Sequence, residues 1–142
     1  MIELSPYIIA GLGGWLVAQV LKYIFVSLRQ RKVASFRHLY FSGNMPSAHS
    51  ATVVAILVVV GILDGIGSGL FGLALVFTSV VLYDAMMVRR SSGEQGVALT
   101  ALMKEQKSKV ALPRVARGHT PLEVVAGAFI GVVVAIVVII WF

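Results

Sequence analysis

Two histidines stand at the starts of long apolar segments, where their imidazole rings can do acid–base or nucleophilic chemistry. His49 lies in the sequence MPSAHS and His119 in the sequence GHTPLE. A histidine can act as a nucleophile, or it can give and take a proton near neutral pH. If both segments begin at the same membrane face, the two rings can form one site, with one as nucleophile and the other as general acid.

Glu123 follows His119 by four residues, a spacing that brings two side chains together on one helical face. A carboxylate bonded to one ring nitrogen sets the tautomer and leaves the other nitrogen able to attack. The same glutamate also fits a capping box, because Thr120, Pro121 and Glu123 have the residue types of N-cap, N1 and N3. Two interpretations therefore stay open for Glu123, a catalytic carboxylate and a structural cap.

Cationic residues lie near both histidines in the sequence. Helix N-termini favour anions such as phosphate, because they present unpaired N–H groups and the positive end of the helix dipole. The cations that can join them are Lys22, Arg29, Arg89, Arg90, Arg114 and Arg117. In the alternative interpretation, Lys22 only anchors its helix at the membrane surface, and Asp84 only pairs with a neighbouring arginine.

The elements that must position these groups are membrane helices. Of the 142 residues, 58% are hydrophobic and only 13% are charged, which excludes an ordinary soluble domain. A helix needs roughly 20 apolar residues to cross a bilayer. We predict one all-α membrane domain spanning 1–142, with four transmembrane helices at about 6–28, 48–63, 66–88 and 121–142. Residues 93–109 predict a helix at the cytoplasmic surface or a cover over the site.

The charge distribution predicts the orientation. The net charge is +6, and the Lys and Arg residues concentrate in the two loops that follow the first and third predicted helices. By the positive-inside rule these loops are cytoplasmic, so both termini lie outside and both histidines face the cytoplasm. We expect an integral protein of the plasma (inner) membrane. Nucleic-acid binding is disfavoured, because no aromatic platform or DNA-binding motif accompanies the charge.

The motifs resemble those of a known enzyme superfamily. The MPSAHS segment resembles the Pro-Ser-Gly-His motif of the type 2 phosphatidic acid phosphatases, and His119 to Gly127 resembles their last motif, His-x-x-x-Asp with a following glycine. The whole chain is more similar to the small, divergent branch related to acid phosphatases and vanadium-dependent haloperoxidases, the domain-of-unknown-function 212 group. Tyr83–Arg90 followed by Gly93 and Gln95, and Gln19 with Lys22, fit that branch.

The resemblance implies a metal-independent phosphatase without a cofactor. It implies that His119 is the nucleophile, Glu123 its orienting carboxylate and His49 the general acid. It also implies that Ser47 and the Ala48 backbone contact phosphate. The superfamily has an arginine six residues before the nucleophile, where this chain has Pro113. The phosphate clamp is therefore expected among Lys22, Arg89, Arg90, Arg114 and Arg117, with Asp84 and Arg29 in support.

The leading hypothesis is a membrane phosphatase that hydrolyses a lipid or polyprenyl phosphate monoester, or a pyrophosphate, through a phosphohistidine. The alternative is a non-catalytic membrane protein that keeps an anion or lipid-headgroup site for transport, scaffolding or assembly. Expected partners are the lipid phosphate and the membrane lipids. A homo-oligomer is also possible, because Gly127 and Gly131 provide a face for close helix contact. Packing of these glycines within the monomer is the equal alternative.

Overall fold

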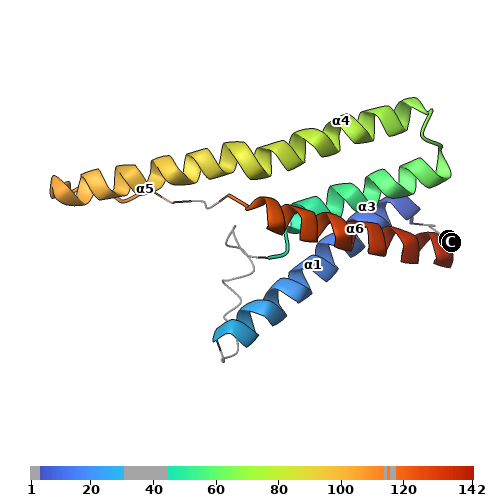
Figure 1. Cartoon of the computed structure of the whole chain (residues 1–142), viewed down its shortest axis with the longest axis horizontal. Helices are drawn as coiled ribbons and strands as arrows, with labels where there is room; N and C mark the ends of the chain where they lie inside the picture. Colours follow the sequence, from blue (N-terminus) through green and yellow to red (C-terminus); the bar gives the residue numbers. More distant parts are fainter. Residues whose placement is uncertain (1–3, 31–44, 114, 116–117) are drawn as a thin grey trace.

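The computed structural model describes residues 4–30, 45–113, 115 and 118–142, and within these residues it is helical with no strand. The described helices form the long rods drawn in Figure 1. They comprise α1 (Pro6–Gln30), α3 (Ala48–Leu63), a continuous rod made of α4 (Gly69–Tyr83), the π turn η1 (Asp84–Val88) and α5 (Arg89–Glu105), and α6 (Pro121–Trp141). The predicted all-α membrane bundle is confirmed.

The shortest helix, α3, lies at the centre of the bundle. It contacts α1, α4 and α6, whereas α4 packs mainly on α3, where Thr78 Oγ1 donates to the carbonyl of Val53 over 3.2 Å. Its buried residues are Ser50, Ala51, Val53, Val54, Ala55, Val59 and Val60. Most outward-facing side chains of α1, α4 and α6 are large and apolar, as expected for surfaces that contact lipid. The central position of α3 therefore places its N-terminus next to three other elements.

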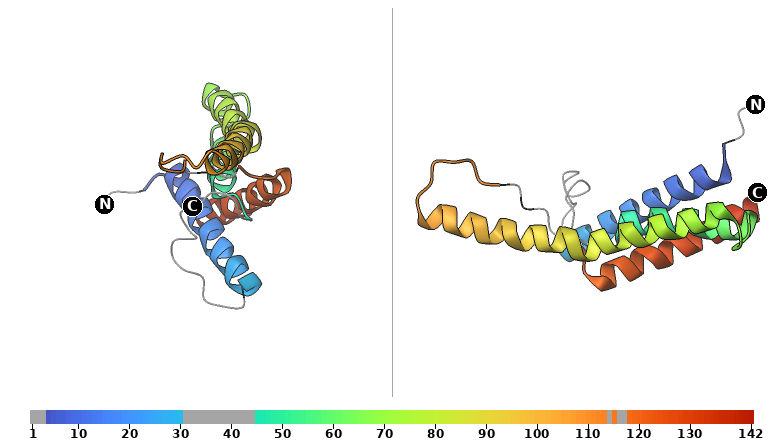
Figure 2. Two further views of the ribbon diagram at one scale, coloured as in Figure 1. Left: turned by 90° about the vertical axis from the view of Figure 1, so that its left-hand side faces the viewer. Right: turned by 90° about the horizontal axis from the view of Figure 1, so that it is seen from above.

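Three helical segments are long and apolar enough to cross a membrane, namely Pro6–Leu28, Gly69–Glu105 and Pro121–Trp141. The remaining predicted span, α3, has 16 residues, or about 24 Å at 1.5 Å per residue. Both α3 and α6 begin at the end of the bundle where α1 ends (Figure 2). We call this the site end, and at the opposite end the Tyr7 hydroxyl donates to Asp64 over 2.6 Å.

The third helix differs from its predicted range of 66–88 at both ends. It begins at Gly69, because Ser68 accepts a hydrogen bond from the Phe71 N–H over 3.0 Å and caps the helix. It does not stop at residue 88 but continues to Glu105, a rod of 37 residues and about 55 Å. Its last part, α5, extends past the other helices (Figure 1). The charged residues that follow Tyr83 mark where the rod leaves its apolar surroundings, and no proline ends the helix there.

Glycines of α6 pack directly on the backbone of α3. Gly127 and Gly131 are buried, and a Cβ on Gly127 would collide with the carbonyl oxygen of Ser47. A Cβ on Gly131 would lie 2.5 Å from the carbonyl oxygen of Ala51. On α1, Gly14 faces the same Ala51 carbonyl from another side. The small-residue face predicted for close helix contact is therefore used within the monomer.

We expect Gly127→Ala to destabilise the protein by about 1–3 kcal/mol, the usual cost of overpacking a close contact. The added methyl group must push α6 away from Ser47, because backbone atoms fill the space. Gly72→Ala is the matched control, since a Cβ at this helical glycine of α4 meets nothing within 4 Å. Thermal unfolding of the three proteins in mild detergent measures the effect. Equal melting temperatures for the two variants would contradict the packing.

Candidate active site

His119 is buried immediately before α6, with 4% of its surface exposed. Its Nδ1 lies 3.0 Å from Glu123 Oε2. The same carboxylate oxygen accepts the Thr120 backbone N–H over 3.0 Å, and Thr120 Oγ1 accepts the Glu123 N–H over 3.4 Å, which completes the capping box. Glu123 therefore contacts His119 and completes the capping box at the same time. With the proton on Nδ1 donated to this carboxylate, Nε2 of His119 carries the lone pair.

The backbone before α6 is docked on the π turn η1. The His119 N–H donates to the carbonyl oxygen of Ala85 over 3.0 Å, and Ala85 is buried. Gly118 permits this approach, because a Cβ there would collide with the backbone of Arg90. Sequence reasoning did not assign a role to Ala85 or Gly118. The contacts of Ala85 and Gly118 are made by backbone atoms, so they leave no side-chain pattern in the sequence. The glycine next to the candidate nucleophile was the one sequence feature that could have indicated a close backbone approach.

The N-terminus of α3 meets the first turn of α6. Ser47 is completely buried, and its Oγ accepts from the Ser50 N–H over 3.4 Å and from the Ser50 hydroxyl over 2.9 Å. The Ser47 N–H donates to the carbonyl oxygen of Glu123 over 3.1 Å. The structure thus gives Ser47 a capping and joining role. Ala48 and His49 come next, and a helix leaves the N–H groups of its first residues without intrahelical partners.

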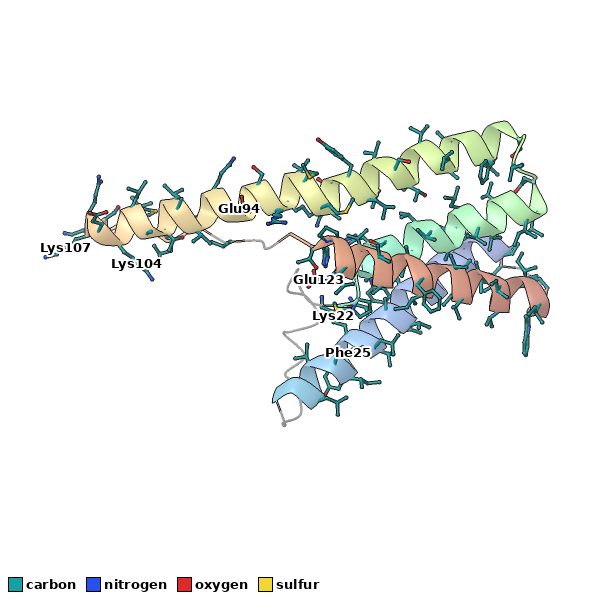
Figure 3. The ribbon with its side chains drawn as sticks, viewed as in Figure 1. Lys22, Phe25, Glu94, Lys104, Lys107 and Glu123 are labelled. Atoms are coloured by element: carbon teal, nitrogen blue, oxygen red, sulfur yellow. The ribbon has the colours of Figure 1, made fainter. Side chains whose placement is uncertain are left out.

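The side chains of His49 and Lys22 belong to the same cluster. His49 is exposed at the site end, whereas Lys22 is only 6% exposed. Arg89, His119 and Lys22 are close enough to His49 to act on it electrostatically. The Lys22 ammonium also attracts the Glu123 carboxylate, and Figure 3 shows these two residues where α1 passes the start of α6. The structure therefore gathers both histidines, Glu123 and Lys22 at one end of the bundle.

The other predicted cations separate into three groups. Arg89 joins the cluster, and its Nε lies 2.7 Å from Asp84 Oδ2. Arg90 is exposed and pairs instead with Glu94, with Nε 3.2 Å from Oε1. The Arg29 side chain, Arg114 and Arg117 lie outside the part of the chain that the structure describes. Within the described part, no group of three or more His, Asp or Glu residues can hold a metal ion.

A cavity of about 430 Å³ opens beside the His119 segment, between that segment and α5. Its lining residues are Arg90, Gly93, Glu94, Val97, Gly118, His119 and Thr120. Cavities of this size can accommodate small molecules. Glu94 and Val97 were not among the predicted site residues. They come to lie near His119 because the rod continues as a helix beyond residue 88.

Comparison with known proteins agrees with the motifs and the helical architecture. The chain is 28% identical to the uncharacterized membrane protein YuiD of Bacillus subtilis (strain 168), over 95% of this chain and 94% of that protein. No solved structure matches the chain significantly. The family model described as the divergent PAP2 family matches residues 5–134. The chain is a membrane protein and belongs to the divergent PAP2 family.

Proposed function

We propose that this protein is a membrane phosphatase that cleaves a lipid or polyprenyl phosphate monoester, or a pyrophosphate, through a phosphohistidine. The observation that carries the proposal is the 3.0 Å contact between His119 Nδ1 and Glu123 Oε2, beside His49 and the cation Lys22. A buried, oriented imidazole next to a second imidazole has the parts of a nucleophile and its proton donor. The family membership supports a phosphatase-related role.

In the first step, the lone pair on His119 Nε2 attacks phosphorus and a P–N bond forms. The bond from phosphorus to the leaving oxygen breaks, and protonated His49 gives its proton to that oxygen. The Glu123 carboxylate stabilises the positive charge that develops on the His119 ring. In the second step, His49 takes a proton from water, the water oxygen attacks phosphorus, and the P–N bond breaks to release phosphate and restore both rings.

Charge stabilisation in both steps falls to the positive groups around the two rings. Phosphoryl transfer depends mainly on positioning and on stabilising the equatorial oxygens. Lys22 provides a nearly buried ammonium group, and a charge with little water around it acts strongly. The N–H groups at the start of α3 favour the same anion. Ser47 supports this arrangement indirectly, by holding the first turns of α3 and α6 together.

The site end also suits a substrate that is anchored in the membrane. Apolar side chains cover the outer surfaces of α1, α4 and α6, whereas Lys22 and Arg89 lie near His49 at the end where α3 and α6 begin. A lipid phosphate places its anion at such a boundary between hydrocarbon and water. By the positive-inside rule this boundary is the cytoplasmic face of the plasma membrane, with both chain termini outside.

Trapping the covalent intermediate tests this proposal most directly. The purified protein in mild detergent is mixed with lipid phosphates that carry ³²P in the phosphoryl group, and the reaction is quenched in alkali. We expect a protein-bound label that survives alkali and is lost in acid, as a phosphoramidate bond requires, and no label on His119→Ala. Binding of orthovanadate without label or phosphate release, across a wide panel of lipid phosphates, would instead support the non-catalytic anion site.

A further inference from the structure

Asp84 and Arg89 form an ion pair across five residues, a spacing at which an ordinary α-helix keeps side chains apart. Five residues at about 100° each put two side chains roughly 140° apart, and helical pairs normally form at three or four residues. Here the two residues bound the π turn η1, in which the Arg89 N–H donates to the Asp84 carbonyl. The wider turn brings Arg89 Nε to 2.7 Å from Asp84 Oδ2. The ion pair therefore depends on the π turn.

The pair leaves the outer part of the guanidinium available. The contact with Asp84 uses Nε, and a guanidinium has two further NH₂ groups in a planar fork. This fork matches two oxygens of a phosphate. The Arg89 side chain is 43% exposed and that of Asp84 is 39% exposed, so an incoming anion can reach the guanidinium. Asp84 thus restrains the arginine without covering it.

The same π turn also holds the candidate nucleophile. Ala85, inside η1, accepts the His119 N–H over 3.0 Å, so a short hydrogen-bonded path connects the arginine and the His119 backbone. Arg89, at the end of this turn, is also close enough to His49 to act on it electrostatically. Its neighbour Arg90 pairs with Glu94 over an ordinary four-residue spacing and lines the cavity beside His119.

We propose that Arg89 is the arginine that grips the phosphoryl oxygens, and that Asp84, together with the π turn, is a positioning residue that aims it. This proposal rests on the proposed function and names the anion clamp of the same site. A fork fixed to a rigid helical turn keeps its direction as the phosphoryl group moves from substrate to His119. Lys22 contributes a point charge from α1 and lacks the fork geometry.

Anion affinity, measured apart from turnover, tests the clamp. Orthovanadate binding to the full chain in mild detergent is followed by isothermal titration calorimetry. We expect Arg89→Ala to weaken binding by about 100-fold and Arg89→Lys by about 10-fold, since charged hydrogen bonds account for effects of this size. Asp84→Asn is expected to weaken binding by about 10-fold. The double variant is expected to bind no more weakly than Arg89→Ala, because Asp84 acts through Arg89.

The matched controls are Glu105→Gln, an exposed carboxylate at the end of α5, and Lys104→Ala, the exposed cation beside it. Both are expected to keep the vanadate affinity within about twofold, as surface pairs and charges usually do. Helical circular dichroism and thermal unfolding show whether each variant is folded. The nearly isosteric Asp84→Asn and the charge-retaining Arg89→Lys still decide the question if Arg89→Ala does not fold.

The clamp is overturned if folded Arg89→Ala binds vanadate like the wild type, if the wild type does not bind vanadate, or if the effects at Asp84 and Arg89 add independently. Phosphate release by the wild type, measured in parallel, separates this result from the proposed function. If the wild type releases phosphate and Arg89→Ala still binds vanadate like the wild type, the clamp proposal is wrong and the phosphatase proposal stands. If vanadate binding requires Arg89 but no lipid phosphate releases phosphate, the clamp proposal stands and the phosphatase proposal is wrong.

Discussion

His119→Ala is expected to lower the rate of phosphate release by roughly 10³-fold to 10⁶-fold, the range seen when a covalent nucleophile is removed. Without the ring no P–N bond can form, and the remaining charges only bind the anion. The measurement is phosphate release from lipid phosphates by the purified proteins. Ser79→Ala is the control for effects of expression and purification. The hydroxyl of this exposed serine donates to the Leu75 carbonyl within α4.

Two further results sharpen this prediction. The substitution removes a buried ring, so the unfolding temperature of His119→Ala must be measured beside its activity. Added imidazole is expected to restore part of the activity, because a free ring can occupy the vacated space and attack phosphorus. Equal phosphate release by a folded His119→Ala and the wild type would remove His119 as the nucleophile.

Glu123→Gln is expected to reduce kcat by roughly 10²-fold to 10⁴-fold while changing stability by less than about 1 kcal/mol. Glutamine is also a capping-box residue, so its side-chain oxygen can still accept the Thr120 N–H. One oxygen, Oε2, contacts both His119 Nδ1 and the Thr120 N–H, so an amide oxygen in its place can keep both contacts and the ring tautomer. The neutral amide, however, does not stabilise the positive charge that develops on the ring during attack, so kcat falls although the helix start is intact.

Thr120→Ala is the complementary variant. It removes the hydroxyl that accepts the Glu123 N–H and should cost about 1 kcal/mol of stability, the usual value for an N-cap. The His119–Glu123 contact does not use that hydroxyl, so kcat should fall by less than about 10-fold. If Glu123→Gln instead lost stability and kept its kcat, the carboxylate would be a cap alone.

Much of the architecture follows from local sequence signals. The apolar runs that became α1, α3 and α6 are visible because a bilayer rewards unbroken hydrophobic stretches, and Thr120, Pro121 and Glu123 mark the start of α6 through local capping chemistry. His49 and His119 were predicted at the same end because the chain crosses the membrane twice between them. The contact between His119 and Glu123 was predicted from the four-residue spacing, but His119 lies before the first residue of α6, and the capping box at Thr120 brings the carboxylate back to it.

The end of the third helix could not be predicted from local sequence signals. The sequence predicted an end near residue 88 and a separate surface helix or cover at residues 93–109, whereas the structure continues one rod to Glu105. Amino-acid composition indicates where a helix leaves apolar surroundings, but it does not indicate where the helix ends. The cavity beside His119 was hidden for the same reason, since its Glu94 and Val97 lie on that continuation.

The sequence by itself determined a helical membrane bundle with both histidines and Glu123 at one end, because hydropathy, charge asymmetry and helical spacing are local or additive properties. Only the tertiary structure placed the Asp84–Arg89 pair beside the His119 backbone. The Asp84–Arg89 pair requires a π turn, and the turn itself docks to His119 through the Ala85 carbonyl, 34 residues away in the chain. Backbone contacts of this kind leave no side-chain pattern, so the sequence did not reveal them.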